Sequence, residues 1–66
     1  MIVNFTLVGN TEDVVLLTVD MEAPPAQNWM IVINETVYEC TGIKAVFTPA
    51  RGGKHTYVIE VRIHPV

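Results

Sequence analysis

Apolar and polar residues alternate with a period of two along almost the entire chain, and no segment shows a convincing helical period. Val, Ile, Thr, Tyr and Phe are frequent in the alternating segments, and these residues favour strands. Such a pattern is typical of strands that bury one face of a sheet. We therefore predict a single all-β domain that spans residues 1–66.

Turn residues divide this domain into five predicted strands. We expect them at residues 2–8, 13–21, 29–34, 36–48 and 55–64. The segment "GNTED" is a turn by composition, and "EAPPAQN" is a loop because its two prolines lack backbone donors. Asn34 and Glu35 form the predicted tight corner between the third and fourth strands, because Asn tolerates a positive φ.

The fourth strand is the longest, and Gly42 interrupts it. The inward-facing set changes there from Tyr38 and Cys40 to Ile43 and Phe47, which indicates an inserted residue, a β-bulge. A long strand bent at a glycine can contribute to two sheets at once. We therefore predict a small five-stranded antiparallel sheet or partly open barrel, of the general SH3 or OB kind, with a long bent fourth strand.

The size of the chain limits how it can be stabilised. A domain of 66 residues buries only about 60% of the surface that its unfolded chain exposes. Half of the residues are hydrophobic, and the single cysteine, Cys40, cannot form an intramolecular disulfide. Small domains without disulfides or structural metal ions depend on an efficient core or on a partner chain. We expect a homo-oligomer, with a dimer as the simplest closed arrangement.

The predicted outward positions support this expectation, because many of them are apolar. They include Ile2, Val8, Val14, Leu16, Met30, Val32, Val46 and Val58. An exposed apolar patch of several hundred Å² usually marks an interface. The candidate interface residues are Val14, Leu16, Met30, Val32 and Val58, with the second and third strands as the main contact surface. The alternative is a more closed barrel in which part of this set belongs to the core.

Charge is distributed unevenly along the chain. Residues 1–39 carry six acidic residues and no Lys or Arg, which gives a net charge of −6. Residues 40–66 carry four basic residues and one acidic residue, Glu60, which gives a net charge of +3. One interpretation is that strands from the two parts lie side by side and neutralise each other. The other is that the polarised chain pairs head to tail with a second copy. We favour the first, because charge pattern alone says little about fold.

The segment "TPARGGKHTY" is the one candidate ligand site. It does not fit a phosphate-binding P-loop, because the first glycine of that motif is missing and no helix follows. A hairpin turn in which the glycines adopt positive φ is the simplest interpretation. The alternative is an anion site for a small ligand or a nucleic-acid backbone, formed by Arg51, Gly52, Gly53, Lys54 and His55.

Enzyme chemistry has little support in the sequence. Cys40 with His55 or His64 is the only nucleophile and base combination, and an inward cysteine in mid-strand is more often structural. We therefore expect no catalytic residue, no cofactor and no metal ligand. The acidic net charge disfavours nucleic acid, as does the prediction that all five aromatic residues point inward.

Function is predicted only in outline. No apolar run approaches the ~18 residues of a membrane span, and the N-terminus lacks the basic start of a secretory signal, so we expect a cytoplasmic protein without membrane contact. The leading hypothesis is a non-enzymatic, self-associating protein-interaction module. Phages and mobile elements encode many small accessory or inhibitor proteins of this length, which bind a host protein.

Overall fold

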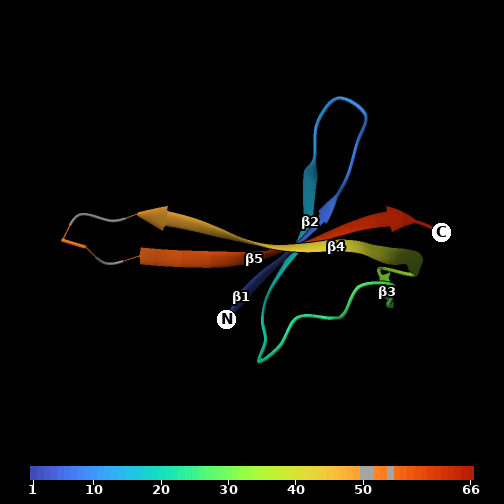
Figure 1. Cartoon of the computed structure of the whole chain (residues 1–66). Helices are drawn as coiled ribbons and strands as arrows, with labels where there is room; N and C mark the ends of the chain where they lie inside the picture. Colours follow the sequence, from blue (N-terminus) through green and yellow to red (C-terminus); the bar gives the residue numbers. More distant parts are fainter. Residues whose placement is uncertain (50–51, 54) are drawn as a thin grey trace.

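The computed structural model describes residues 1–49, 52–53 and 55–66. Five strands form one sheet in the order β2-β1-β5-β4-β3, and the sheet curls into a half-barrel (Figure 1). The strands are β1 (Ile2–Leu7), β2 (Val14–Asp20), β3 (Met30–Ile33), β4 (Thr36–Pro49) and β5 (His55–Pro65). The predictions of an all-β fold, a small partly open barrel and a long fourth strand are confirmed.

The sheet is mixed, and this differs from the antiparallel expectation. β1 and β5 run parallel, with Val3 opposite Ile59 and Phe5 opposite Val61, whereas the other three pairs are antiparallel. The predicted loop between β2 and β3 explains the difference. It carries the chain from one edge of the sheet to the other, so that β5 returns to the centre beside β1 (Figure 1).

The two predicted tight turns have the expected backbone geometry. Asn34 and Glu35 have φ values of 50° and 69°, which match the left-handed conformation of a two-residue hairpin between β3 and β4. Gly52 and Gly53 have φ values of 86° and 79° between β4 and β5. Glycine tolerates this conformation without steric cost, so the prediction of a glycine hairpin is confirmed.

Two bulges shape the sheet. The predicted one lies between Cys40 and Gly42 in β4, where the register against β5 shifts. The second lies in the β1–β2 pair, where the register shifts between Phe5 and Thr6. No glycine or proline marks this second bulge in the sequence, so alternation alone did not reveal it. It changes which side chains of β2 face inward.

The core is small and lies at the centre of one face, called here the inner face. The buried hydrophobic residues are Val3, Phe5, Cys40, Val61 and Ile63. Half-buried residues that pack against them are Val19, Met21, Ile31, Ile33, Tyr38 and Ile59. Met21 lies in the loop that joins β2 to β3, and Pro25 in the same loop is buried. The curl of the sheet and this loop therefore cover one part of the inner face.

Beyond this core, β4 and β5 continue as a two-stranded arm, defined here as Val46–Pro49 and His55–Val58. β1 pairs with β5 only from Ile59 onward, and β3 pairs with β4 only up to Glu39. Among the residues that the structure describes, no third strand therefore accompanies the arm. The arm is the long projection in Figure 1. The radius of gyration is 12.8 Å, whereas a compact domain of this length has about 10.8 Å.

Candidate interaction surfaces

Exposed hydrophobic side chains outnumber buried ones in the part of the chain that the structure describes. Fifteen large hydrophobic residues are exposed, and five hydrophobic residues form the core. The accessible surface is 4817 Å², whereas a compact protein of 7.3 kDa has about 4,200 Å². Many large hydrophobic residues contribute to this surface, so the distribution of their side chains is the central question for function.

The first group of exposed apolar side chains belongs to β2, an edge strand of the sheet. Val14, Val15, Leu16 and Leu17 are all exposed. The bulge places Val14 opposite Leu7, in the row of the inner face that contains Ile63. The prediction that Val14 points outward is therefore wrong.

Val15, the next residue, lies opposite Thr6, on the other side of the strand from Val14. β2 thus presents apolar side chains on both sides.

The second group belongs to β3, at the other edge. Met30 and Val32 are 60% and 66% exposed, and Trp29 just before them is also exposed. The expectation that Trp29 points inward is wrong, because it precedes the strand and follows Asn28, whose φ is positive. β2 and β3 lie at opposite edges and do not touch. The candidate residues on these two strands therefore do not form one continuous patch.

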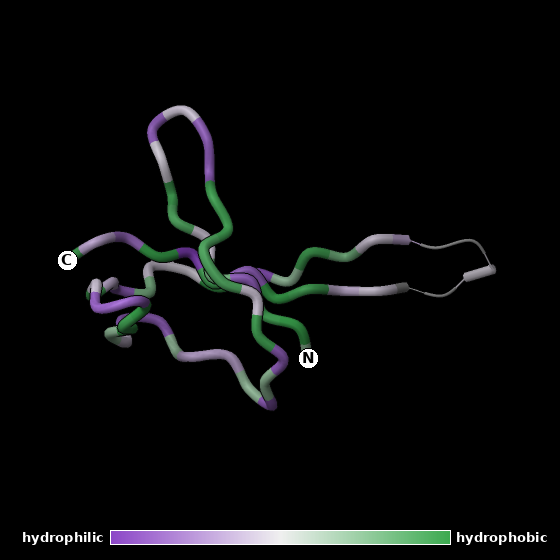
Figure 2. The backbone as a smooth tube through the Cα atoms, turned by 180° about the vertical axis from the view of Figure 1, so that it is seen from behind, coloured by the Kyte–Doolittle hydropathy of each residue, from purple (hydrophilic) through white to green (hydrophobic). Residues whose placement is uncertain are grey.

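The third group lies along β4 and β5. Four exposed side chains share the inner face of these strands, and we call them the arm strip. They are Phe47 and Tyr57 in the arm, and Ile43 and Ala45 in the part of β4 just before it. Phe47 and Tyr57 are opposite each other, with ring centroids 5.5 Å apart, and are 64% and 48% exposed. Figure 2 shows apolar segments continuing from the sheet into the arm.

The expectation that these two aromatics are inward core residues is wrong, because no strand in the described part of the chain covers them.

The outer face of the sheet is polar at its centre. Thr18, Asn4, Glu60 and Lys44 form a row across β2, β1, β5 and β4. The Thr18 hydroxyl donates to Asn4 Oδ1 at 2.7 Å, and Lys44 Nζ lies 3.6 Å from Glu60 Oε2. The outward apolar residues therefore surround a polar centre. Val58, a candidate interface residue on this face, is half-buried rather than exposed, and it pairs with Val46.

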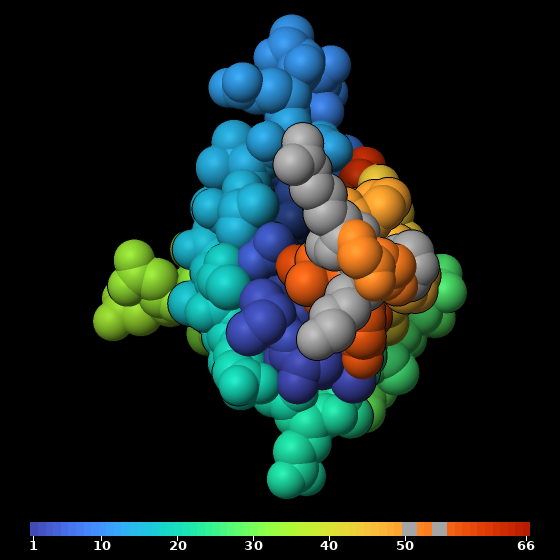
Figure 3. Space-filling view, turned by 90° about the vertical axis from the view of Figure 1, so that its left-hand side faces the viewer, coloured from blue at the N-terminus to red at the C-terminus, as the bar shows by residue number. Residues whose placement is uncertain are grey.

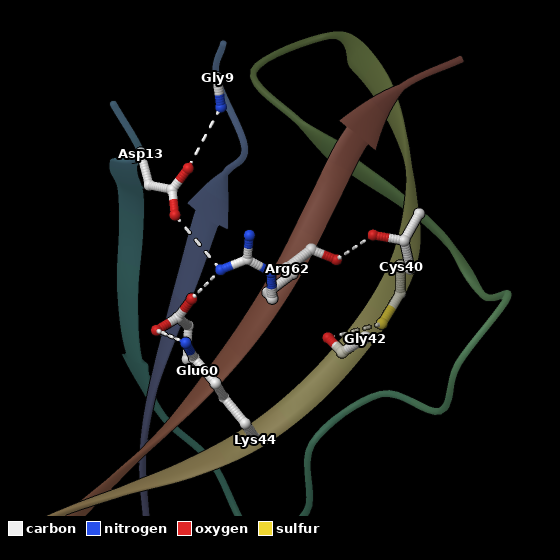
Figure 4. Close-up of polar contacts among 8 residues, drawn as sticks. Gly9, Asp13, Cys40, Gly42, Lys44, Glu60 and Arg62 are labelled. Atoms are coloured by element: carbon white, nitrogen blue, oxygen red, sulfur yellow. Dashed lines mark hydrogen bonds and ion pairs between the residues drawn. The ribbon is translucent and has the colours of Figure 1, made fainter. Parts of the chain in front are cut away.

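Arg62 connects the acidic and basic parts of the chain. Its Nη1 donates to Glu60 Oε1 at 2.9 Å and to Asp13 Oδ2 at 3.2 Å (Figure 4). The hydrogen bond to Glu60 is the main cause that raises the pKa of the guanidinium, and Asp13 adds to it. The interpretation that the two parts of the chain lie side by side and neutralise each other is confirmed at this pair.

Cys40 is fully buried in the core, as its inward mid-strand position predicts. Burial raises the pKa of the thiol above its ordinary value of 9.0, with Glu39 adding a smaller effect in the same direction. The thiol donates to the Gly42 carbonyl at 3.8 Å. A buried thiol with a raised pKa remains protonated at neutral pH, so Cys40 is a poor nucleophile.

The remaining site predictions concern ligands. Arg51 and Lys54 of the candidate anion site lie outside the described residues, as does the side chain of His55, while Gly52 and Gly53 are exposed. The anion site therefore stays a prediction. The described residues contain no group of three or more His, Cys, Asp or Glu side chains able to hold a metal ion, and no pocket is found among them.

Exposure of Trp29, Phe47 and Tyr57 removes one of the two arguments against nucleic-acid binding. The acidic net charge is the one that remains.

Comparisons with protein-family models, with curated proteins and with solved structures give no match to this chain. No helix in the described part of the chain is long and apolar enough to cross a membrane.

Proposed function

We propose that this chain is a non-enzymatic, self-associating protein-interaction module. The observation that supports this proposal is the threefold excess of exposed over buried hydrophobic residues in the described part of the chain. Scattered apolar side chains are normal on a protein surface. Here they are grouped on β2, on β3 and along the arm strip, and such grouping is typical of contact surfaces.

Energetics favour the same conclusion. Complete burial of an aliphatic side chain contributes about 1.5–3 kcal/mol. Association costs roughly 4–15 kcal/mol in lost freedom of motion. Several half-exposed residues on β2 and the arm strip are enough to offset much of that cost. The polar centre of the outer face, with its paired charges, has no such need for a partner.

A biological role follows by analogy with other very small proteins. We assign this chain to the small accessory or inhibitor proteins of phages and mobile elements, which act by binding a host protein. The unpaired Cys40 suits a reducing compartment such as the cytoplasm.

Self-association is tested by light scattering or analytical ultracentrifugation of the purified chain over a range of concentrations. We expect a dimer that dissociates on dilution, and we expect Leu16→Asp to shift the equilibrium to monomer. Asn10→Asp is the matched control, because it adds the same charge in the exposed β1–β2 loop. A wild-type chain that stays monomeric at every concentration contradicts the proposal, and so does a dimer that both substitutions weaken equally.

A further inference from the structure

We infer that the partner on these surfaces is a second copy of this chain, and that the arm strip of each copy packs against β2 of the other. This inference rests on the proposed function and specifies its geometry. It differs from the sequence prediction, which placed the contact on β2 and β3 and treated Phe47 and Tyr57 as core.

In the described part of the chain, the arm has no third strand to support it. An isolated two-stranded hairpin is marginal in water, and stable strands normally pack one face against something else. One face of β4 and β5 here carries the arm strip, in which Phe47 is 64% exposed. In the described part of the chain, β2 touches neither β4 nor β5. Figure 3, which looks along the arm from its tip, shows β2 and the arm on opposite sides of β1.

The bulge in β2 determines how that strand can be used. Regular strand addition needs side chains that alternate along the edge, and a bulge interrupts this alternation. In β2, Val14 and Leu17 both face inward although they are three positions apart. A second strand therefore cannot continue the ladder along the whole of β2. Packing of side chains against the apolar surface of β2 avoids this difficulty.

Charge favours contact between the arm and β2 over contact between two arms. The sequence from Val46 to Val58, which spans the arm, contains the basic residues Arg51 and Lys54 and no acidic residue. Acidic residues flank β2 on both sides, with Glu12 before it and Glu22 after it. Asp13 and Asp20 also lie at the ends of β2, but they pair with Arg62 and with the N-terminal ammonium of the same chain. Two arms placed together repel each other, whereas an arm on β2 brings opposite charges together. This is the head-to-tail pairing that the charge pattern left open.

Reciprocal contact also supplies more area than one patch can. A fully buried aromatic side chain covers roughly 150–250 Å², so the exposed parts of Phe47 and Tyr57 amount to about 200 Å² per arm. A stable dimer buries about 800 Å² per partner. In a twofold arrangement each copy contributes both an arm strip and a β2 surface, which about doubles the apolar area to roughly 400 Å² per partner. This is about half of what a stable dimer buries, so we expect a dimer that dissociates on dilution. The arrangement is closed, so it does not propagate into fibres.

Cross-linking between two variants, each with one added cysteine beside the native Cys40, tests this geometry. Phe47→Cys and a tagged Leu17→Cys chain are mixed, allowed to exchange subunits, and treated with a short bismaleimide. We expect a mixed cross-linked dimer. Val32→Cys replaces Leu17→Cys in the matched control, because Val32 is more exposed but lies on β3. The wild-type chain controls for Cys40, which is buried.

A second measurement does not depend on cross-linking chemistry. Phe47→Ser, which alters an exposed side chain, is expected to raise the dissociation constant of the dimer by about tenfold or more. Added salt is expected to weaken the wild-type dimer, because opposite charges flank the contact.

Each outcome decides between the claims. A dimer whose Phe47→Cys chains cross-link mainly to each other, or to Val32→Cys, overturns this inference and leaves self-association standing. A dimer whose dissociation constant Phe47→Ser does not change also overturns this inference and leaves self-association standing. A wild-type chain that is monomeric throughout overturns the proposed function and this inference together.

Discussion

The two halves of β5 follow the same apolar alternation but differ in burial. Val61 and Ile63 are fully buried, whereas Tyr57, on the same face, is 48% exposed. The difference lies in what surrounds them. Val61 has β1 on one side and β4 on the other, but Tyr57 has only Phe47 beside it. Alternation therefore predicts which face a residue occupies, and the neighbouring strands determine whether that face is covered.

The strongest test of this comparison replaces one valine in the core and one in the arm. Val61→Ala removes buried methyl groups from the core and is expected to lower the free energy of unfolding by about 2 kcal/mol. Val46→Ala in the arm makes the same chemical change at an exposed site, where we expect less than ~0.5 kcal/mol. Urea denaturation followed by circular dichroism measures both values. Equal shifts of the two midpoints are incompatible with an uncovered arm.

The pH dependence of the free energy of unfolding tests the burial of Cys40, which lies in the covered part of β4. Burial raises the pKa of this thiol in the folded protein above the ordinary 9.0. Below pH 9 both states are protonated and stability is unaffected. As the pH rises further, the unfolded chain loses its proton first, so the free energy of unfolding decreases until the pH passes the pKa of the folded protein.

The expected slope for this single proton is at most about 1.4 kcal/mol per pH unit. Thermal unfolding between pH 7 and 10 measures it, with Cys40→Ala as the control for other titrating groups. If the variant loses stability over this range as fast as the wild type does, Cys40 is not the group responsible.

The smallest expected effect concerns Gly42, at the bulge where the covered part of β4 ends. A Cβ atom there meets only Arg62 Cδ, at an ordinary 3.9 Å, and the φ of Gly42 is not in the left-handed region. We expect Gly42→Ala to be neutral or to stabilise the fold by about 0.4–1 kcal/mol, because alanine restricts the unfolded chain. Gly52→Ala is the contrasting variant, since its φ of 86° is costly for alanine. A destabilising Gly42→Ala would mean that the bulge itself requires glycine.

Much of the fold was predictable from the sequence because local signals determine it. Alternation gave the five strands, the Asn34–Glu35 corner and the glycine pair gave two turns, and Gly42 marked one bulge. Strand order was not predictable, because nothing local records that β5 returns beside β1. The bulge in β2 was missed because β-branched and leucine residues run through it without a marker.

The candidate interface was predictable only in part. Exposure of Val14, Leu16, Met30 and Val32 follows from an excess of apolar residues over core volume, which composition reveals. The arm strip was missed because Phe47 and Tyr57 occupy correct inward positions on strands that extend past their neighbours. Strand length compared with that of adjacent strands is the signal that would have found it, and it requires the strand order.

The parallel pairing of β1 with β5 has a consequence for how this chain is made. Val3 and Phe5 acquire their neighbours Ile59 and Val61 only after β5 has been synthesised. Until then the β1–β2 pair and the β3–β4 pair lack the central strand that joins them. Folding is therefore expected to depend on contacts between segments far apart in the sequence, which slows the search. During that interval the apolar side chains of β2 are available to chaperones.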